Sequence, residues 1–288
     1  MILLFRLHQW LKNFLLFVPL FFSGHIQDID LLIQISAAFL SFSLMASAVY
    51  VLNDYVDIER DKLHPIKQFR PLASGEVSKP KAQLMFLLLF VASIISSFLI
   101  DYHLVLIVLI YFVLNVLYSI RLKHDAIIDI TIISIGFLLR IFAGSLPFDI
   151  MVSKWLIIMI FLSAMFIGIA KRRGELILEN EGATRKSLEG YNLQFVDIAM
   201  VMMAAVTIVC YMMYTVSEEV VARIGSDYIY ITTFFVIIGI LRYLQLTIVF
   251  GKTEAPTKVF LKDRFIQVCI ICWILVFGWF LYGFNIVF

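Results

Sequence analysis

Long apolar runs, separated by short polar segments, dominate the chain. Most of them approach the roughly 20 residues that an α-helix needs to cross a bilayer. We expect nine such helices, over residues 14–26, 31–52, 82–100, 103–120, 126–148, 154–170, 196–216, 227–250 and 266–287. This pattern predicts an all-α polytopic membrane protein, a nine-helix bundle that forms one integral membrane domain over 1–288. The run at 14–26 is short, and no small-residue cleavage site follows it, so we expect a retained span and not a signal peptide.

Composition and charge support this class and orient the chain. Hydrophobic residues make up 62% of the sequence and charged residues 15%, which excludes a soluble fold. Almost all Lys and Arg fall in segments that share one membrane face if the N-terminus is cytoplasmic, whereas the opposite connections hold only Lys154 and Arg223. The positive-inside rule then predicts a cell-membrane protein with a cytoplasmic N-terminus, an outside C-terminus and cytoplasmic catalytic loops at about 53–81, 118–129 and 171–195. We expect the bilayer as a partner and no nucleic acid, and a homo-oligomer stays open.

The segment 53–61, Asn-Asp-Tyr-Val-Asp-Ile-Glu-Arg-Asp, holds the strongest candidate chemistry. On a helix, Asp54, Asp57 and Asp61 project from one face, while Glu59 points elsewhere. Converging carboxylates repel one another unless a cation lies among them, and Mg²⁺ takes hard oxygen ligands while leaving positions for substrate phosphates. The stripe therefore predicts a magnesium and diphosphate site that includes Asn53; a solvated acidic helix end is the alternative.

Basic residues follow this stripe. Pro65 and Pro71 stop helix formation, which places Lys67 and Arg70 on a turn beyond the carboxylates. Such a cation pair suits a diphosphate, although ordinary positive-inside residues would look similar.

The second loop contains Lys123 close to Asp125 and Asp129, which are spaced i, i+4 at a helix start. We expect Asp129 to be a second acidic wall or an orienting group for Lys123, and a structural ion pair is the alternative. Arg140 lies deeper in the same helix and needs a buried partner, which favours a structural role.

The third loop begins with three consecutive cations, residues 171–173, followed by Glu175 and Glu179 at i, i+4. The cations predict a phosphate cradle, and a topology signal alone would not require the glutamates. By contrast, the pair Cys269 and Cys272 lies in an apolar span without a neighbouring acid or His, so we interpret these thiols as packing residues.

Together these motifs resemble the UbiA superfamily of intramembrane prenyltransferases over essentially the whole chain. The likeness rests on N-D-x-x-D-x-x-x-D at 53–61, followed by H-P at 64–65 and R-P-L-A-S-G at 70–75. In that family a second Asp-rich motif, D-x-x-x-D, also holds Mg²⁺ on the donor diphosphate. This chain instead has Lys-Arg-Arg-Gly-Glu at 171–175.

That substitution, with Q-W-L-K-N at 9–13 and Y-S-x-x-L-K at 118–123, is similar to the branch that transfers 5-phosphoribose from phosphoribosyl diphosphate to a polyprenyl phosphate. The resemblance implies a Mg²⁺-dependent phosphoribosyltransferase of cell-wall biosynthesis, with Asp54, Asp57, Asp61 and Lys123 as candidate catalytic residues. It also implies a wider substrate-binding set: Lys12, Asn13, Lys67, Arg70, Tyr118, Arg121, Asp129, Lys171, Arg172, Arg173, Glu175, Arg185 and Tyr191.

Two other functions remain open on the sequence. A UbiA-type prenyltransferase that acts on an aromatic or quinone-precursor acceptor would use the same first motif. A transporter would place ionisable groups near the bilayer midplane, whereas the polar groups here gather at one predicted face.

Overall fold

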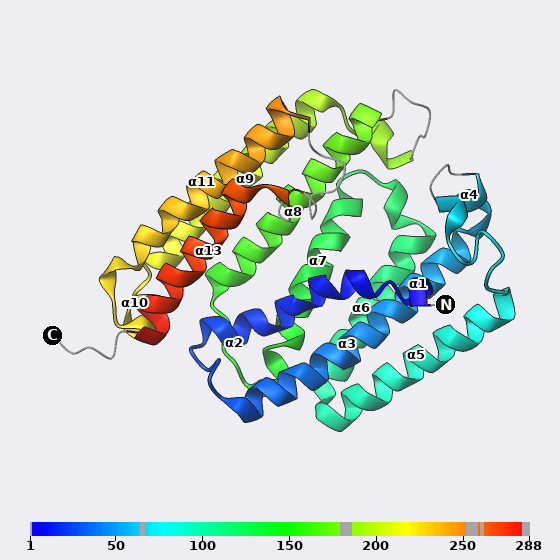
Figure 1. Cartoon of the computed structure of the whole chain (residues 1–288), viewed down its shortest axis with the longest axis horizontal. Coiled ribbons are helices and arrows are strands. Elements are labelled where there is room, and N and C mark those ends of the chain that lie inside the picture. The colour runs from blue at the N-terminus through cyan, green and yellow to red at the C-terminus, as the bar shows by residue number, and fades with distance from the viewer. Residues whose placement is uncertain (1, 64–66, 179–185, 252–258, 260–261, 284–288) are drawn as a thin grey trace. The chain divides into compact units, whose positions relative to one another are not determined.

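The computed structural model describes residues 2–63, 67–178, 186–251, 259 and 262–283, which are helical or irregular and contain no strand (Figure 1). The predicted all-α class is thus confirmed. The chain divides into two compact units, Met1–Val152 and Ser153–Phe288, and each is described by itself. The single membrane domain over 1–288 stays a prediction.

The first unit contains the Asp-rich segment. Its elements are α1 (Ile2–Phe5), η1 (Leu7–Phe17), α2 (Val18–Phe22), α3 (Ile29–Val56), α4 (Ile58–Lys62), η2 (Lys67–Phe69), α5 (Lys79–Ile100), α6 (Tyr102–Ile120), η3 (Leu122–His124), α7 (Ile128–Ala143) and η4 (Leu146–Phe148). Aspartates begin two of the long helices: Asp28 accepts a hydrogen bond from the Leu31 amide and Asp101 from the His103 amide.

The second unit contains the third basic loop. Its elements are α8 (Lys154–Leu178), η6 (Lys186–Gly190), α9 (Leu193–Thr215), α10 (Glu218–Ile224), η7 (Asp227–Thr232), α11 (Thr233–Leu244), η8 (Gln245–Val249), α13 (Arg264–Gly278) and η9 (Trp279–Gly283). Here α8 packs on α9, and α11 packs on both α9 and α13.

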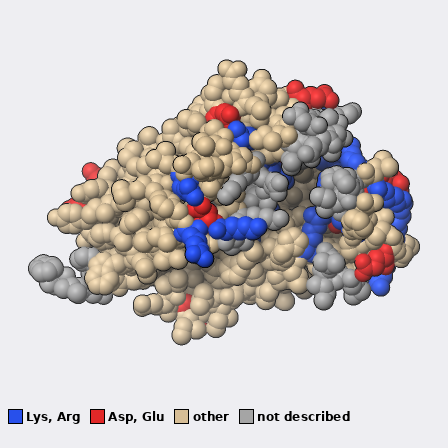
Figure 2. All heavy atoms as spheres, turned by 45° about the horizontal axis from the view of Figure 1, so that its top comes forward, with Lys and Arg blue, Asp and Glu red and all other residues tan. Residues whose placement is uncertain are grey.

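Eight helical stretches within the described residues are long and apolar enough to cross a membrane, beginning with Ile29–Val56 and ending with Arg264–Gly283. The expected span at 14–26 is not among these eight stretches: the end of η1, a 3₁₀ helix, and the five-residue α2 occupy residues 14–22. In Figure 2 the charged side chains form a few groups on an otherwise uncharged face, as expected for a multi-pass membrane protein.

A ladder of polar contacts holds η1 along α3, and it explains why η1 is 3₁₀ and not α. In Figure 1 these two elements run beside each other at the N-terminal end of the chain. The contacts pair Asn13 with Ser43 (2.8 Å), Trp10 with Ser47 (3.0 Å), Gln9 with Tyr50 (3.4 Å) and Arg6 with Asp54 (2.5 Å).

The lengths of the two sides of this ladder must match. On α3, Ser43 and Asp54 are separated by ~16 Å at the α-helical rise. From Arg6 to Asn13, an α-helix would cover only ~10 Å, whereas the steeper 3₁₀ rise covers ~14 Å. The steeper 3₁₀ rise therefore brings the length of this segment closer to the length that its four partners span on α3.

A glycine permits η1 to pack closely against the end of α7. A Cβ placed on Gly144 would lie 1.8 Å from the Leu16 carbonyl oxygen, so a larger residue would force the main chains apart. Leu16 itself is fully buried in the core cluster that also contains Leu20, Phe42 and Leu104. Sequence periodicity carries no signal for such a contact between distant segments.

Candidate functional site

The Asp-rich segment lies where α3 ends and α4 begins. The prediction of one continuous helical face is wrong in detail, because the helix is interrupted at Asp57, whose φ of −91° and ψ of 7° depart from helical values. Asp54 and Asp61 are buried, with 2% and 3% of their surfaces exposed, while Asp57 is half-buried. As predicted, Glu59 points elsewhere: it is exposed and pairs with Lys62 at 3.0 Å.

Each of the three aspartates contacts a cation. Arg70 Nη1 lies between two of them, 3.2 Å from Asp54 Oδ1 and 2.6 Å from Asp61 Oδ2. Arg6 Nη2 donates to Asp54 Oδ1 at 2.5 Å. Lys123 Nζ donates to Asp57 Oδ1 at 2.7 Å across 66 residues of sequence. The three carboxylates thus face three basic side chains, and this set of six groups is formally neutral.

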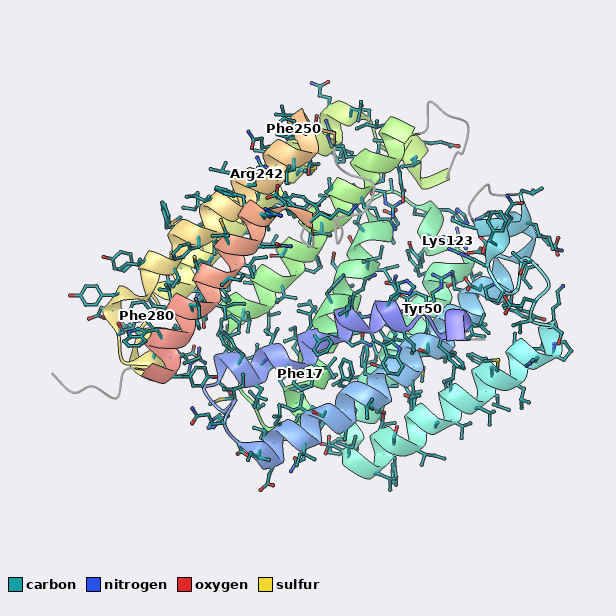
Figure 3. The ribbon with its side chains drawn as sticks, in the orientation of Figure 1. Phe17, Tyr50, Lys123, Arg242, Phe250 and Phe280 are labelled. Atoms are coloured by element: carbon teal, nitrogen blue, oxygen red, sulfur yellow. The ribbon has the colours of Figure 1, made fainter. Side chains whose placement is uncertain are left out.

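In Figure 3, Lys123 lies near the end of α3 that leads into α4, and Tyr50, which belongs to the polar contacts between η1 and α3, lies beside η1. Lys123 is 6% exposed, and burial of an ammonium group is favourable only with a charge partner, which Asp57 supplies. The prediction that Asp129 orients Lys123 is therefore not supported by the contacts: Lys123 donates to Asp57, and one Asp129 oxygen accepts from the Ile130 amide.

The oxygen atoms of the site residues are suitable ligands for a divalent cation, although their contacts within the chain are not those of a complete metal coordination sphere. Among the described residues, no group of three or more His, Cys, Asp or Glu side chains is arranged to hold a metal ion. However, two buried carboxylates already share one cationic nitrogen, that of Arg70. Hard oxygen donors that converge on one positive centre are what Mg²⁺ requires.

Asn53, the fourth predicted metal ligand, is held by the neighbouring helix. Its side-chain oxygen accepts a hydrogen bond of 3.1 Å from the Ser119 hydroxyl at the end of α6. Ser119 is 4% exposed. This contact brings the predicted second loop, which starts at Tyr118, against the Asp-rich segment.

Asn13 and Arg140 form a separate buried polar cluster. Arg140 donates to the Asn13 side-chain oxygen (2.8 Å), the Gly136 carbonyl (2.6 Å) and the Tyr111 hydroxyl (3.2 Å). Its guanidinium also lies over the rings of Phe42 and Tyr111, at 5.3 and 5.1 Å. No carboxylate pairs with Arg140 in the described parts of the chain. These contacts support the structural role expected for Arg140 and place the predicted substrate ligand Asn13 within the protein interior.

The third predicted loop belongs to the second unit. Arg172, which is fully buried, pairs with Glu175, and the more exposed Lys171 lies 3.9 Å from the same carboxylate group. Arg173 is 7% exposed and donates to Asp197 on α9 (2.6 Å) and to the Thr247 carbonyl (2.7 Å). These contacts join α8 to α9 and η8, whereas phosphate binding by the three cations stays a prediction.

The remaining predicted residues differ in burial. Tyr191 is buried and its ring packs against Phe195 at 6.1 Å. Three predicted residues are half-buried and Arg121 is exposed; the half-buried ones are Lys12, Lys67 and Tyr118. Lys67 begins the single turn η2, consistent with the predicted turn before Arg70. Arg185 lies outside the described residues, as do His64, Pro65 and Glu179.

Sequence reasoning missed Arg6 as a site residue. The chain adopts a left-handed conformation at Arg6 (φ 49°), which turns it from α1 into η1, and the guanidinium lies 5.0 Å from the Tyr50 ring. Arg6 and its carboxylate partner are 48 residues apart, so no local sequence pattern indicates that they are in contact. Only the match between polar residues of η1 and a polar stripe on α3 could have revealed it.

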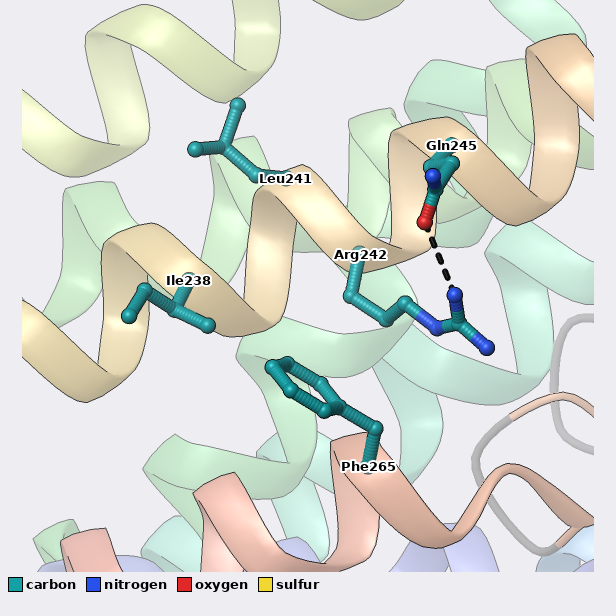
Figure 4. A pocket seen from close by; sticks show the side chains of 5 residues that line it. All are labelled: Ile238, Leu241, Arg242, Gln245 and Phe265. Carbon is teal, nitrogen blue, oxygen red and sulfur yellow. Dashed lines mark hydrogen bonds between the residues drawn. The ribbon is translucent and has the colours of Figure 1, made fainter.

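A pocket in the second unit is lined by none of these residues. It has a volume of ≈ 390 Å³ and is lined by Ile238, Leu241, Arg242, Gln245 and Phe265 (Figure 4). Arg242 donates to Gln245 at 2.8 Å and forms an ion pair with Asp263 at 2.8 Å. Among the described residues that line it, Arg242 is the cation, and Asp263 neutralises it, so the pocket is a weaker candidate for a phosphate than the Asp-rich site.

The fold and the site define a multi-pass helical membrane protein with a buried cluster of acids and bases where α3, α4 and η3 meet. Residues 14–266 match the UbiA prenyltransferase family, and the chain belongs to this family. The predicted family is thus confirmed.

Curated relatives agree with the predicted branch. The chain is 36% identical over 282 residues to a decaprenyl-phosphate phosphoribosyltransferase of Mycolicibacterium smegmatis, with 93% of this chain and 88% of that protein covered. It is 32% identical over 279 residues to the protein of the same name in Mycobacterium tuberculosis, covering 95% and 91%.

Solved structures share the fold. A UbiA homolog from Archaeoglobus fulgidus bound to DMAPP and Mg²⁺ superimposes with a TM-score of 0.70 over 99% of this chain and 98% of that chain. The two sequences are 16% identical, so this likeness shows the fold alone.

Proposed function

We propose that the protein transfers 5-phosphoribose from phosphoribosyl diphosphate to a polyprenyl phosphate and releases diphosphate. Relatives at 32–36% identity over more than nine tenths of the chain are named for the decaprenyl-phosphate reaction. The observation in the structure that supports a diphosphate donor is the set of three aspartates, two of them buried, in contact with Arg6, Arg70 and Lys123. We further propose a cytoplasmic site, with the N-terminus inside and the C-terminus outside, from the distribution of Lys and Arg.

Mg²⁺ would be held by Asp54, Asp57 and Asp61 with Asn53, and when bound it would neutralise charge on the departing diphosphate. We expect Arg70 and Lys123, which contact these carboxylates, to bind the diphosphate oxygens. The acceptor phosphate is already anionic and needs little help from a general base. Positioning and charge neutralisation by the basic side chains therefore supply most of the rate, and attack opposite the diphosphate inverts the configuration at ribose C1.

Product mass tests the donor. Purified protein in detergent is supplied with a polyprenyl phosphate and either phosphoribosyl diphosphate or a prenyl diphosphate, with an aromatic acceptor in a parallel reaction. We expect a polyprenyl phosphate product heavier by one phosphoribosyl group. Prenylation of the aromatic acceptor, without phosphoribosyl transfer, would instead assign the chain to the prenyltransferase alternative.

Two matched acid substitutions test the site. Asp57→Asn removes a proposed metal-ligand charge and is expected to abolish turnover while the protein stays folded. Glu59→Gln is the control, because Glu59 is two residues away, exposed and paired only with Lys62. Equal activity of the two variants at saturating Mg²⁺ would contradict the assignment.

A further inference from the structure

Arg70 occupies a position between two candidate metal ligands. Its Nη1 atom is within hydrogen-bond distance of Asp54 Oδ1 and Asp61 Oδ2, whose side chains are only 2% and 4% exposed. One guanidinium nitrogen between two buried carboxylates has the electrostatic role of a bridging cation. A divalent ion on the same oxygens therefore competes with Arg70.

The charge balance makes this competition strong for a metal ion alone. The three carboxylates are already neutralised by Arg6, Arg70 and Lys123. A divalent ion that enters without an anion adds two positive charges next to three buried or half-buried cations. A diphosphate that enters with the ion supplies the compensating negative charge and gives the displaced guanidinium a new acceptor.

We propose that Arg70 exchanges partners during ligand binding: it leaves Asp54 and Asp61 when the metal ion binds them, and it then binds the donor's diphosphate. Metal and diphosphate consequently bind cooperatively, and Arg70 is a coupling residue between them. This inference rests on one part of the proposed function, the binding of a metal ion with a diphosphate. It does not depend on whether the transferred group is ribosyl or prenyl. Lys123, which holds Asp57, makes a second exchange of the same kind.

The exchange predicts opposite effects of one substitution on two ligands. In Arg70→Gln the carboxylates lose their competing cation, so the affinity for a metal ion alone increases, by about tenfold or more for one charged hydrogen bond. The affinity for diphosphate in the presence of metal decreases by a similar factor, because its guanidinium partner is absent. A residue that only binds phosphate would leave the affinity for metal alone unchanged.

The experiment uses the full-length protein in detergent, Mn²⁺ as the metal probe followed by electron paramagnetic resonance, and inorganic diphosphate as the anion. Arg60→Gln is the matched control, since Arg60 is exposed on α4 and the substitution removes the same charge from the same segment. We expect wild type and Arg60→Gln to bind Mn²⁺ weakly alone and much more tightly with diphosphate. By thermodynamic reciprocity, Mn²⁺ should strengthen diphosphate binding by the same factor.

Two results would overturn the exchange. One is equal Mn²⁺ affinity of the wild type with and without diphosphate, which requires no variant and so holds even if Arg70→Gln does not fold. The other is an unchanged or lower Mn²⁺ affinity in a folded Arg70→Gln protein. Neither result tests the identity of the product. If the donor test shows no phosphoribosyl transfer while metal and diphosphate still bind cooperatively, the proposed function is wrong and the exchange of Arg70 is still supported.

Discussion

The contact between Asn13 and Arg140 gives a quantitative test of how the N-terminal segment is held. Asn13 is fully buried, accepts from Arg140 Nε at 2.8 Å and donates to Ser43 at 2.8 Å. Replacing it with Leu, which has a similar volume, removes both hydrogen bonds with little change in packing. The Arg140 bond is charge-assisted, and we expect its loss to lower the free energy of unfolding by about 1.5–3 kcal/mol. The neutral Ser43 bond adds only about 0.6 kcal/mol, typical for polar contacts between membrane helices.

A double-mutant cycle isolates the charged contact. In an Arg140→Met background, Asn13→Leu can lose only the Ser43 bond, so its cost should fall to about 0.6 kcal/mol. The coupling energy is then about 1.5–3 kcal/mol, which unfolding of the four proteins in detergent by increasing SDS would measure. Thr232→Val is the control partner, because Thr232 bonds to Tyr211 in the second unit and shares no contact with Arg140. Additivity of Asn13→Leu and Arg140→Met within about 0.5 kcal/mol would refute the reasoning.

Three further substitutions test other contacts. Gly144→Ala should lower the melting temperature because the new Cβ meets the Leu16 carbonyl, whereas Gly278→Ala, with nothing within 4 Å, should not; equal melting temperatures would contradict the close approach. Asp197→Asn removes the partner of Arg173 and should lower the melting temperature without changing the apparent KM for the donor, and a selective rise in KM would instead favour a phosphate-binding role. Hydrogen bonds from Arg242 lower the pKa of Asp263. This pair therefore stabilises the folded state above the ordinary pKa of about 3.9, and the stabilisation is lost as the pH falls. In melting curves from about pH 6 to pH 3, Asp263→Asn should lack this part of the acid destabilisation.

The local sequence pattern was sufficient to predict that the chain is a multi-pass membrane protein and to identify the Asp-rich segment. Apolar length predicts a spanning helix directly, and eight of the nine expected spans correspond to helices in the described residues. The proximity of Arg70 to Asp61 was accessible as well, since only nine residues separate them. The single turn η2, which precedes Arg70, packs against α4.

Contacts across long stretches of sequence could not be predicted in the same way. Lys123 has Asp125 and Asp129 close in sequence, yet it pairs with Asp57, because the end of α6 lies against the end of α3 through Ser119 and Asn53. Arg6 was likewise missed, since its partner Asp54 is chosen by the docking of η1 and not by a local motif. The interruption at Asp57 also has no residue signal such as Pro or Gly.

The 3₁₀ winding of the N-terminal segment and the position of Arg6 have one physical cause. A helical segment can keep the α-helical rise, or it can adopt a longer rise that lets its polar residues meet a polar stripe on a neighbouring helix. In this chain Trp10 and Asn13 meet Ser47 and Ser43, and buried polar groups in an apolar environment are costly unless such partners exist. Satisfying them favours the longer 3₁₀ rise over α-helical winding, and the same register brings Arg6 onto Asp54. The N-terminal segment thereby contributes a cation to the site.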